Sequence, residues 1–131
     1  MKYLLDANVV VTLIRGANPT LARRVRRHEP TELAISAIVS HELYYGAFKS
    51  LRPSHNLGIV DGLQFPVLDF DTEDARHAGE IRAALALRGT PVGPLDVLIA
   101  GQARSRGLVL VTHNTREFAR IQGLRIEDWH A

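Results

Sequence analysis

The stretch Gly107-Leu-Val-Leu-Val-Thr-His-Asn114 predicts a buried β-strand that ends in polar residues. The glycine is a typical end for the helical pattern that precedes it. The apolar run 108–111 is typical of a central strand in a parallel sheet, because helices cover both faces of such a strand. Ligands of open parallel sheets bind beyond the carboxyl ends of the strands. We therefore expect a site near Thr112 and Asn114.

Short strands of the same kind are expected along the rest of the chain, and helical patterns separate them. The expected strands cover 2–5, 33–35, 67–70 and 108–111, with a last extended stretch around 124–126. The expected helices run from Asp6 to Gly16, from Pro19 through the arginines, from Ser36 or Ser40 to Lys49, over 54–64, from Asp71 or Thr72 to about Gly89, over 95–106 and near 115–120. This alternation predicts one domain, 1–131, with an α/β fold: a three-layer α/β/α sandwich around a mostly parallel sheet of four to five strands.

Composition limits the class of protein. The chain has 131 residues, 46% of them apolar, which suffices for a core. It has no cysteine, no run near the roughly 18 apolar residues that span a bilayer, and no secretory leader pattern. A cytoplasmic protein without a membrane partner is expected. Net charge is only +2, yet 14 of the 16 basic residues are arginine, which grips phosphate in pairs of hydrogen bonds. Four of these arginines lie within 23–27. A solvated helix face explains this cluster as well as phosphate binding does.

Three carboxylates occupy positions that favour a site. Asp6 follows the first strand, although a helix N-cap explains it as well. Glu42 lies on the rim of the buried face of its helix, where a solvated residue is the ordinary alternative. Asp96 is the strongest candidate, because Ile99, Ala100 and 103 continue its helix face as apolar residues. A carboxylate on such a face is costly unless it is capped or paired with a cation.

The three carboxylates together predict a divalent metal site. Carboxylates about 4 Å apart repel by about 4 kcal/mol per pair at an effective dielectric near 20, and a divalent cation reverses that interaction. An all-oxygen set suits Mg²⁺ or Mn²⁺, which can lower the pKa of a bound water and neutralise charge on a phosphate. The six histidines form no zinc motif, since Tyr45 stands where the HExxH pattern begun at His41 needs its second histidine. Hydrolysis of a phosphodiester is the expected chemistry.

These segments resemble the PIN-domain family, and within it the VapC-like toxins of toxin–antitoxin pairs. Four segments and the tail carry the resemblance: Tyr3-Leu-Leu-Asp-Ala-Asn8, Ile35-Ser-Ala-Ile-Val-Ser-His-Glu-Leu-Tyr-Tyr-Gly46, Gly93-Pro-Leu-Asp-Val-Leu-Ile-Ala100, Leu110-Val-Thr-His-Asn-Thr-Arg-Glu-Phe118 and Gly123-Leu-Arg-Ile-Glu-Asp-Trp129. The resemblance implies a PIN-like fold and an endoribonuclease that depends on Mg²⁺ or Mn²⁺. It also implies an RNA substrate, a cognate antitoxin that inhibits the enzyme, and a homodimer. Asp6, Glu42 and Asp96 match the family's acidic positions.

The chain departs from the family at the fourth acidic position, where it has Asn114. An asparagine can still ligate through its carbonyl oxygen or position a water, so Asn114 stays among the expected catalytic residues. Glu117 could supply the missing charge, but its spacing from Asn114 also fits a capping box, and we favour that structural role. Thr112 could bind a water or support the carboxylates, and Asn8 could steady Asp6; a strand end and an early helical position explain them about equally well.

Two other functions share these features. One is a noncatalytic α/β module that binds RNA or a protein; the other is a metal-dependent nuclease that acts on DNA. The helix at 9–14 is apolar nearly all round, which predicts cover on both sides. Part of it, with the face around 38–48, is expected to pack against a partner helix or a second copy.

Overall fold

The computed structural model describes residues 1–131 and contains one five-stranded, wholly parallel sheet in the order β3-β2-β1-β4-β5. The strands are β1 Tyr3–Leu5, β2 Leu33–Ser36, β3 Val67–Leu68, β4 Val109–Val111 and β5 Ile126–Glu127. The helices are α1 Ala7–Arg15, α2 Pro19–Arg26, α3 Ala37–Phe48, α4 Pro53–Asp61, α5 Thr72–Leu87, α6 Pro94–Ser105 and α7 Thr115–Phe118, with a 3-10 turn at Pro30–Glu32.

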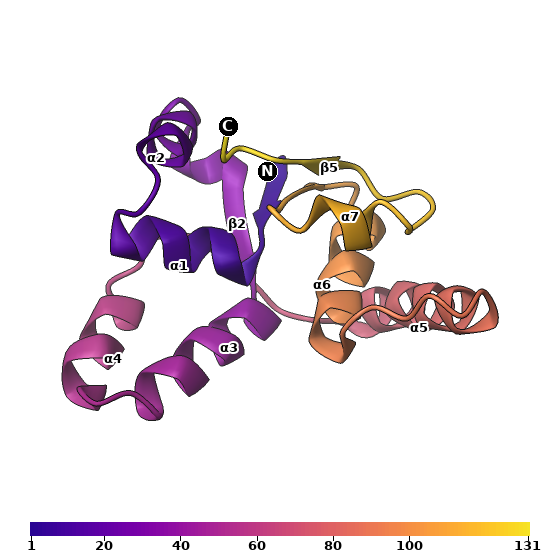
Figure 1. The fold of residues 1–131 in the computed structure, drawn as a ribbon, viewed down its shortest axis with the longest axis horizontal. Helices are drawn as coiled ribbons and strands as arrows, with labels where there is room; N and C mark the ends of the chain where they lie inside the picture. The colour runs from indigo at the N-terminus through magenta and orange to yellow at the C-terminus, as the bar shows by residue number, and fades with distance from the viewer.

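Helices α1 to α4 lie on one side of the sheet and α5 to α7 on the other (Figure 1). The strand order explains this division. The chain moves from β1 outward to β2 and β3, then returns past β1 to β4 and β5. Right-handed crossovers in opposite directions place their helices on opposite faces. The direction reverses between β1 and β4, and open parallel sheets bind ligands at such a switch point. The expected α/β/α sandwich is confirmed.

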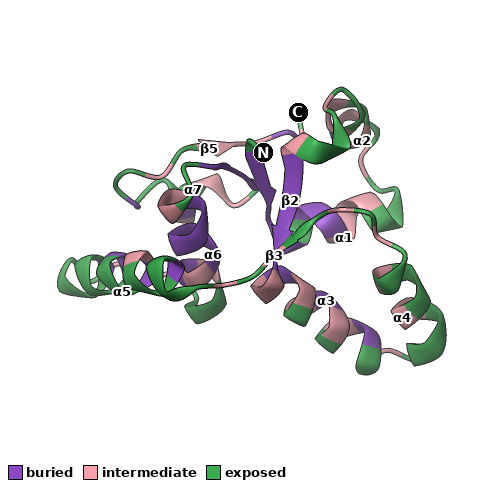
Figure 2. Cartoon of the chain, turned by 180° about the vertical axis from the view of Figure 1, so that it is seen from behind, coloured by how far each residue is buried: buried purple, intermediate pink, exposed green.

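The apolar strands form the centre of the core. All residues of β1, β2 and β4 are buried, and Figure 2 shows them enclosed by helices whose outer faces are exposed. A cluster of 25 buried residues joins the sheet to both helix layers. The register pairs Leu4 with Ala34 on one side and with Leu110 on the other, so side chains of like character face the same layer. None of the helices has the length and apolar character needed to cross a membrane.

Most expected elements form with small shifts at their ends, and β3 differs most. It spans Val67–Leu68 rather than 67–70. The main-chain oxygen of Asp69, which would continue the ladder, instead accepts from Nε2 of Gln102 (3.0 Å) and from the guanidinium of Arg106. A side chain of α6 and that of Arg106, the residue after the helix, thus take the hydrogen bonds of this backbone oxygen, and the strand ends there. The last strand lies at Ile126–Glu127, one or two residues after the expected stretch.

The close crossing of α5 and α6 orients the first turn of α6. A Cβ atom on Gly101 would lie 2.6 Å from the backbone and side chain of Ala78, so only glycine permits this approach. Beside the crossing, the fully buried Asp74 accepts from Arg106 and Gln102, at 3.0 and 3.2 Å. Burial opposes ionisation here, but the bond from Arg106 and the backbone N–H of Asp71 hold the pKa of Asp74 below its usual value. This packing fixes the position from which Asp96 projects.

Candidate active site

Asp6 and Thr112 meet at the switch point between β1 and β4. The backbone N–H of Asp6 donates to the oxygen of Val111 at 3.0 Å, which continues the strand pairing by one residue. Oδ1 of Asp6 accepts from the N–H of Ala7 (2.8 Å) and caps α1, while Oδ2 accepts from the hydroxyl of Thr112 (2.8 Å). The N-cap role and a role in the site are therefore compatible. Asn8 is exposed and makes no hydrogen bond to Asp6.

Asp6 is held as a buried carboxylate with few stabilising partners. Only 4% of the residue is exposed. Burial raises the pKa of Asp6, and the bonds from Thr112 and Ala7 offset this only in part. Neither partner is charged. The hydroxyl of Thr112 also accepts from the N–H of Asn114 at 3.0 Å, so one fully buried threonine ties Asp6 to the segment after β4. The supporting hydroxyl expected at Thr112 is present.

Glu42 reaches the same region from α3. Ser36, at the end of β2, caps this helix through its hydroxyl (3.0 Å from the N–H of Ile38), and Val39, Leu43 and Ala47 are its buried stripe. Glu42 is half-buried beside that stripe, on the rim as expected. Burial and the carboxylates of Asp96 and Asp6 raise its pKa. Its Oε1 is buried and has no hydrogen-bond partner.

Asp96 lies in the first turn of α6, with buried residues at Ile99, Ala100 and 103 along its face. Burial, then the carboxylates of Asp6 and Glu117, raise its pKa to about 6. Oδ2 of Asp96 lies over Gly93, where an added Cβ would come within 3.1 Å of that oxygen. The glycine thus leaves room for this carboxylate at the start of the helix.

The capping box expected between Asn114 and Glu117 is not formed. The side chain of Asn114 makes no capping bond to α7. Instead, its Nδ2 donates to Oε2 of Glu117 at 3.1 Å. The Glu117 carboxylate is near enough to Asp96 to raise that residue's pKa. The capping box that favoured a structural role for Glu117 is therefore absent, and the role of Glu117 stays a prediction.

No arginine or lysine forms an ion pair with the carboxylates of Asp6, Glu42, Asp96 or Glu117. Water molecules would have to complete the shell of an ion between them. The unpartnered Oε1 of Glu42 and the oxygen donors fit Mg²⁺ or Mn²⁺.

The arginine-rich α2 does not supply cations to this group. Arg24 instead donates to the main-chain oxygens of Asp128 and Ala131, at 3.2 and 3.1 Å, and so holds the tail of the chain. Arg15, on α1, lines a groove together with Glu42.

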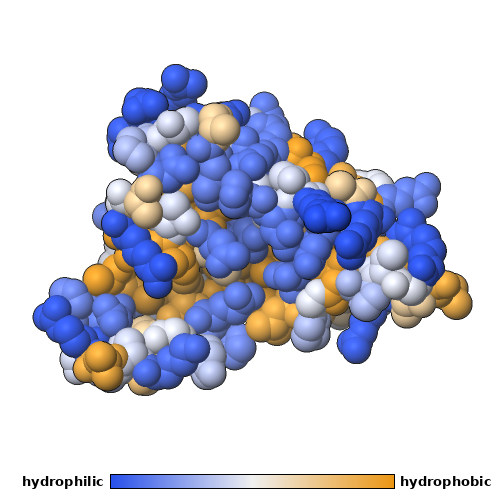
Figure 3. Space-filling model, viewed as in Figure 1, coloured by the Kyte–Doolittle hydropathy of each residue, from blue (hydrophilic) through white to orange (hydrophobic).

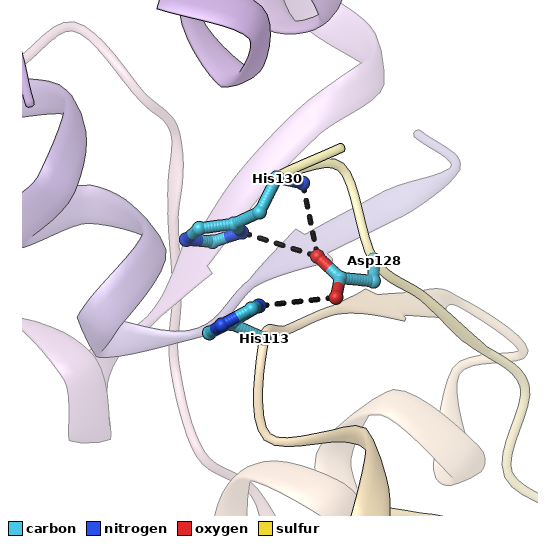
Figure 4. Close-up of side chains that lie close together, drawn as sticks. All are labelled: His113, Asp128 and His130. Atoms are coloured by element: carbon cyan, nitrogen blue, oxygen red, sulfur yellow. Dashed lines mark hydrogen bonds and ion pairs between the residues drawn. The ribbon is translucent and has the colours of Figure 1, made fainter. Parts of the chain in front are cut away.

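A second polar cluster was missed by the motif search. His113, Asp128 and His130 have donor atoms that all lie within 4.8 Å of one another (Figure 4). Zinc motifs in a sequence have their ligands at helical or short loop spacing. Here His113 follows β4 and the other two residues follow β5, and the pairing of Val111 with Glu127 brings them together. The adjacent placement of the last two strands was the only signal in the sequence.

The PIN-domain family model matches residues 3–124, and the chain belongs to this family. It is 50% identical over 131 residues to a protein of Salmonella typhimurium named tRNA(fMet)-specific endonuclease VapC, with 98% of each chain covered. A protein of Shigella flexneri with the same name is 46% identical over the same share. The structure titled "Crystal structure of DNA bound VapBC from Salmonella typhimurium" superposes with a TM-score of 0.93 at 50% identity, covering 98% of both chains.

Nucleases of the VapC type in this family generally depend on a divalent metal. That dependence agrees with the carboxyls of Glu42 and Asp96, whose pKa values are raised by burial and by neighbouring carboxylates. The family assignment and the site geometry thus point to the same chemistry.

Proposed function

We propose that this chain is a VapC-type endoribonuclease toxin whose Asp6, Glu42 and Asp96 hold Mg²⁺ or Mn²⁺, partly through water. One observation carries the proposal: burial and the carboxylates of Asp96 and Asp6 raise the pKa of Glu42, and its Oε1 is buried without a hydrogen-bond partner. Such a group is costly when it is empty and favourable around a cation. The ribonuclease names of the relatives agree with this chemistry.

The side chains divide the work of the site. A bound divalent ion would supply charge neutralisation at a phosphate and a more acidic water. Asp6 is oriented for ligation by Thr112, and Asp96 is oriented by its place above Gly93. Asn114 holds Glu117, which we place at the edge of the site as an acceptor for a water rather than as a fourth direct ligand. Asn114 therefore acts through Glu117 and retains a free carbonyl oxygen for substrate or water.

The proposed substrate is the initiator tRNA. The two relatives at 50% and 46% identity are named for cleavage of tRNA(fMet), and their similarity covers 98% of this chain. An RNA substrate also implies a cytoplasmic location. The test is incubation of the purified chain with tRNA(fMet), an elongator tRNA and a single-stranded DNA of equal length, each with Mg²⁺ and with EDTA.

Cleavage of tRNA(fMet) alone, only with Mg²⁺, is the expected result. Cleavage of the DNA at a similar rate would support a metal-dependent DNA nuclease instead. Binding of the tRNA without cleavage, unaffected by EDTA, would identify a noncatalytic RNA-binding module. Cleavage of both tRNAs at the same rate would support the proposed ribonuclease activity. It would contradict the proposed specificity for tRNA(fMet).

The proposed antitoxin contact is an apolar groove between α1 and the α3–α4 pair. Figure 3 shows apolar side chains gathered in this hollow, with polar groups around it. The groove has a volume of about 410 Å³. Its lining residues are Val11, Ile14, Arg15, Glu42, Leu43, Gly46, Ala47, Lys49, Ser50, Asn56, Ile59 and Val60. An apolar helix seated there would end beside Glu42 and could block the carboxylates.

The titles of similar structures describe VapBC complexes, which supports an antitoxin as the occupant of this groove. In this proposal the antitoxin covers the exposed face of α1, on which Ile14 is 37% exposed. This face is then the second side of the helix that the sequence predicts to be covered. Co-expression with the adjacent reading frame should yield a stable complex that Ile14→Asp disrupts. A complex unaffected by Ile14→Asp would place the contact elsewhere. The expected homodimer is a separate proposal, tested by light scattering of the isolated chain.

A further inference from the structure

The cluster of His113, Asp128 and His130 brings two imidazole nitrogens to one carboxylate. Nδ1 of His113 lies 3.0 Å from Oδ2 of Asp128, and Nδ1 of His130 lies 3.2 Å from Oδ1. The two rings are stacked, with centroids 4.2 Å apart. Figure 4 shows both rings on the same side of the carboxylate, so their nitrogens and its oxygens face a common space.

The two residues from the tail are held in place by contacts other than those within the cluster. Trp129, between them, is 1% exposed and stacks against His28. The main-chain oxygen of His130 accepts from Nδ2 of Asn18 at 3.1 Å. Arg24 donates to the main-chain oxygen of Asp128, so its positive charge engages the backbone and not the carboxylate. The donor set is thus largely organised in advance.

The hydrogen bonds of the cluster are incomplete. Nδ1 of His130 is buried and makes no hydrogen bond, although it lies 3.2 Å from Oδ1 of Asp128. The backbone N–H of the same residue already donates to Oδ1 at 2.9 Å. Burial favours the neutral acid, but that N–H and the imidazole of His113 hold the pKa of Asp128 below its ordinary value. The cluster therefore contains an ionised carboxylate beside a buried nitrogen without a partner.

We propose that His113, Asp128 and His130 form a second metal site, which takes Zn²⁺ or a similar divalent transition metal. Zinc binds histidine nitrogen and carboxylate oxygen about 2.1 Å away, so donors 3.0 and 3.2 Å apart subtend about 90 to 100° at the ion. Two donors of a tetrahedral zinc ion are about 3.4 Å apart, so donor atoms that now lie within 4.8 Å of one another have to close by up to about 1.4 Å, which a rotation of the exposed His113 ring can supply. Waters complete the shell.

This site differs from the carboxylate group in its donor chemistry. Two imidazoles and one carboxylate favour Zn²⁺, Co²⁺ or Ni²⁺, whereas the oxygen donors of Asp6, Glu42 and Asp96 suit Mg²⁺ or Mn²⁺. An ion held here would link the tail to the segment that carries Thr112 and Asn114. It would therefore stabilise the fold whether or not the chain cleaves RNA, and the proposal does not depend on the proposed function.

The test is titration of the untagged, metal-free chain with Zn²⁺, by calorimetry, and with Co²⁺, by visible absorption, in excess Mg²⁺. We expect one Zn²⁺ per chain and a cobalt spectrum with nitrogen ligation. We also expect Zn²⁺ at about 100 times Kd to raise Tm by roughly 5–10 °C. His113→Ala and Asp128→Asn should each weaken binding about tenfold or more, because a three-ligand site tolerates no loss.

His55→Ala is the matched control, because His55 is an exposed histidine on α4, outside the cluster. It should bind Zn²⁺ like the parent chain. Equal binding by His113→Ala, or no thermal shift with Zn²⁺ in the parent, would overturn the proposal. The His113 side chain is 65% exposed, so His113→Ala should have the same Tm as the parent chain in the absence of metal. This variant therefore tests the metal site even if Asp128→Asn does not fold.

Discussion

Replacing Asp96 by asparagine should stabilise the metal-free chain while it removes metal-dependent cleavage. Burial, Asp6 and Glu117 raise the pKa of Asp96 from 3.8 to about 6. Each unit of pKa shift corresponds to about 1.4 kcal/mol, so the full effect would be about 3 kcal/mol. Water screens this half-buried group, and we expect about 1–2 kcal/mol in practice. Asparagine has nearly the same shape and no charge to repel its neighbours.

The contribution of Asp96 to the free energy of unfolding depends on pH. The folded state holds the proton of Asp96 more tightly than the unfolded state does. Stability from this group is therefore fully present below pH about 4 and is lost as the pH rises through about 6. In EDTA at pH 7.5, Asp96→Asn should unfold at a higher temperature, by about 3–8 °C. At pH 4.5 the difference should shrink by more than half.

Thermal and urea unfolding of both chains, with EDTA and with Mg²⁺, measures this effect. Mg²⁺ should stabilise the parent and have little effect on Asp96→Asn. The matched variant Asp74→Asn should change stability in the opposite direction, by about 2–3 kcal/mol, because Arg106 holds the pKa of Asp74 low. An Asp96→Asn chain that is no more stable than the parent at pH 7.5, or a difference independent of pH, would refute the electrostatic reasoning.

Three further predictions concern the surroundings of the site. Thr112→Val removes the hydroxyl that donates to Asp6 at 2.8 Å; it should weaken Mg²⁺ binding about tenfold, by calorimetry, and cost about 1–3 kcal/mol of unfolding free energy. Glu117→Gln should raise the Mg²⁺ concentration for half-maximal cleavage several-fold with little change in the EDTA-state Tm. Gly101→Ala should cost about 1–3 kcal/mol in urea unfolding, because its Cβ would lie 2.6 Å from α5. Gly79→Ala, which meets nothing within 4 Å, should be neutral or slightly stabilising.

The fold was predictable because its strong signals are local. The apolar strand 109–111 and the glycine before it indicate a buried parallel strand without any tertiary information. The end of β3 was not predictable, because Gln102 and Arg106 compete for the main-chain oxygen of Asp69 from more than thirty residues away. Sequence periodicity carries no information about such a contact.

The candidate site also contains residues with a local sequence signal and residues without one. Asp96 could be singled out because the apolar face of its own helix makes a charge there costly. The role of Glu117 could not be decided, since its spacing from Asn114 fits a capping box and the observed amide-to-carboxylate bond equally well. The cluster of His113, Asp128 and His130 depends on the pairing of β4 with β5. The spacing of residues in the sequence does not reveal this pairing.

The central claim is that Asp6, Glu42 and Asp96 make the chain a metal-dependent ribonuclease. The most direct test is the single-turnover rate of tRNA(fMet) cleavage by the parent and by Asp96→Asn, measured side by side across a Mg²⁺ titration. We expect saturable Mg²⁺ dependence in the parent and a rate lower by about 10² or more in Asp96→Asn at every Mg²⁺ concentration, which corresponds to about 3 kcal/mol of transition-state stabilisation. Equal rates in the two chains, or cleavage by the parent in EDTA, would contradict it.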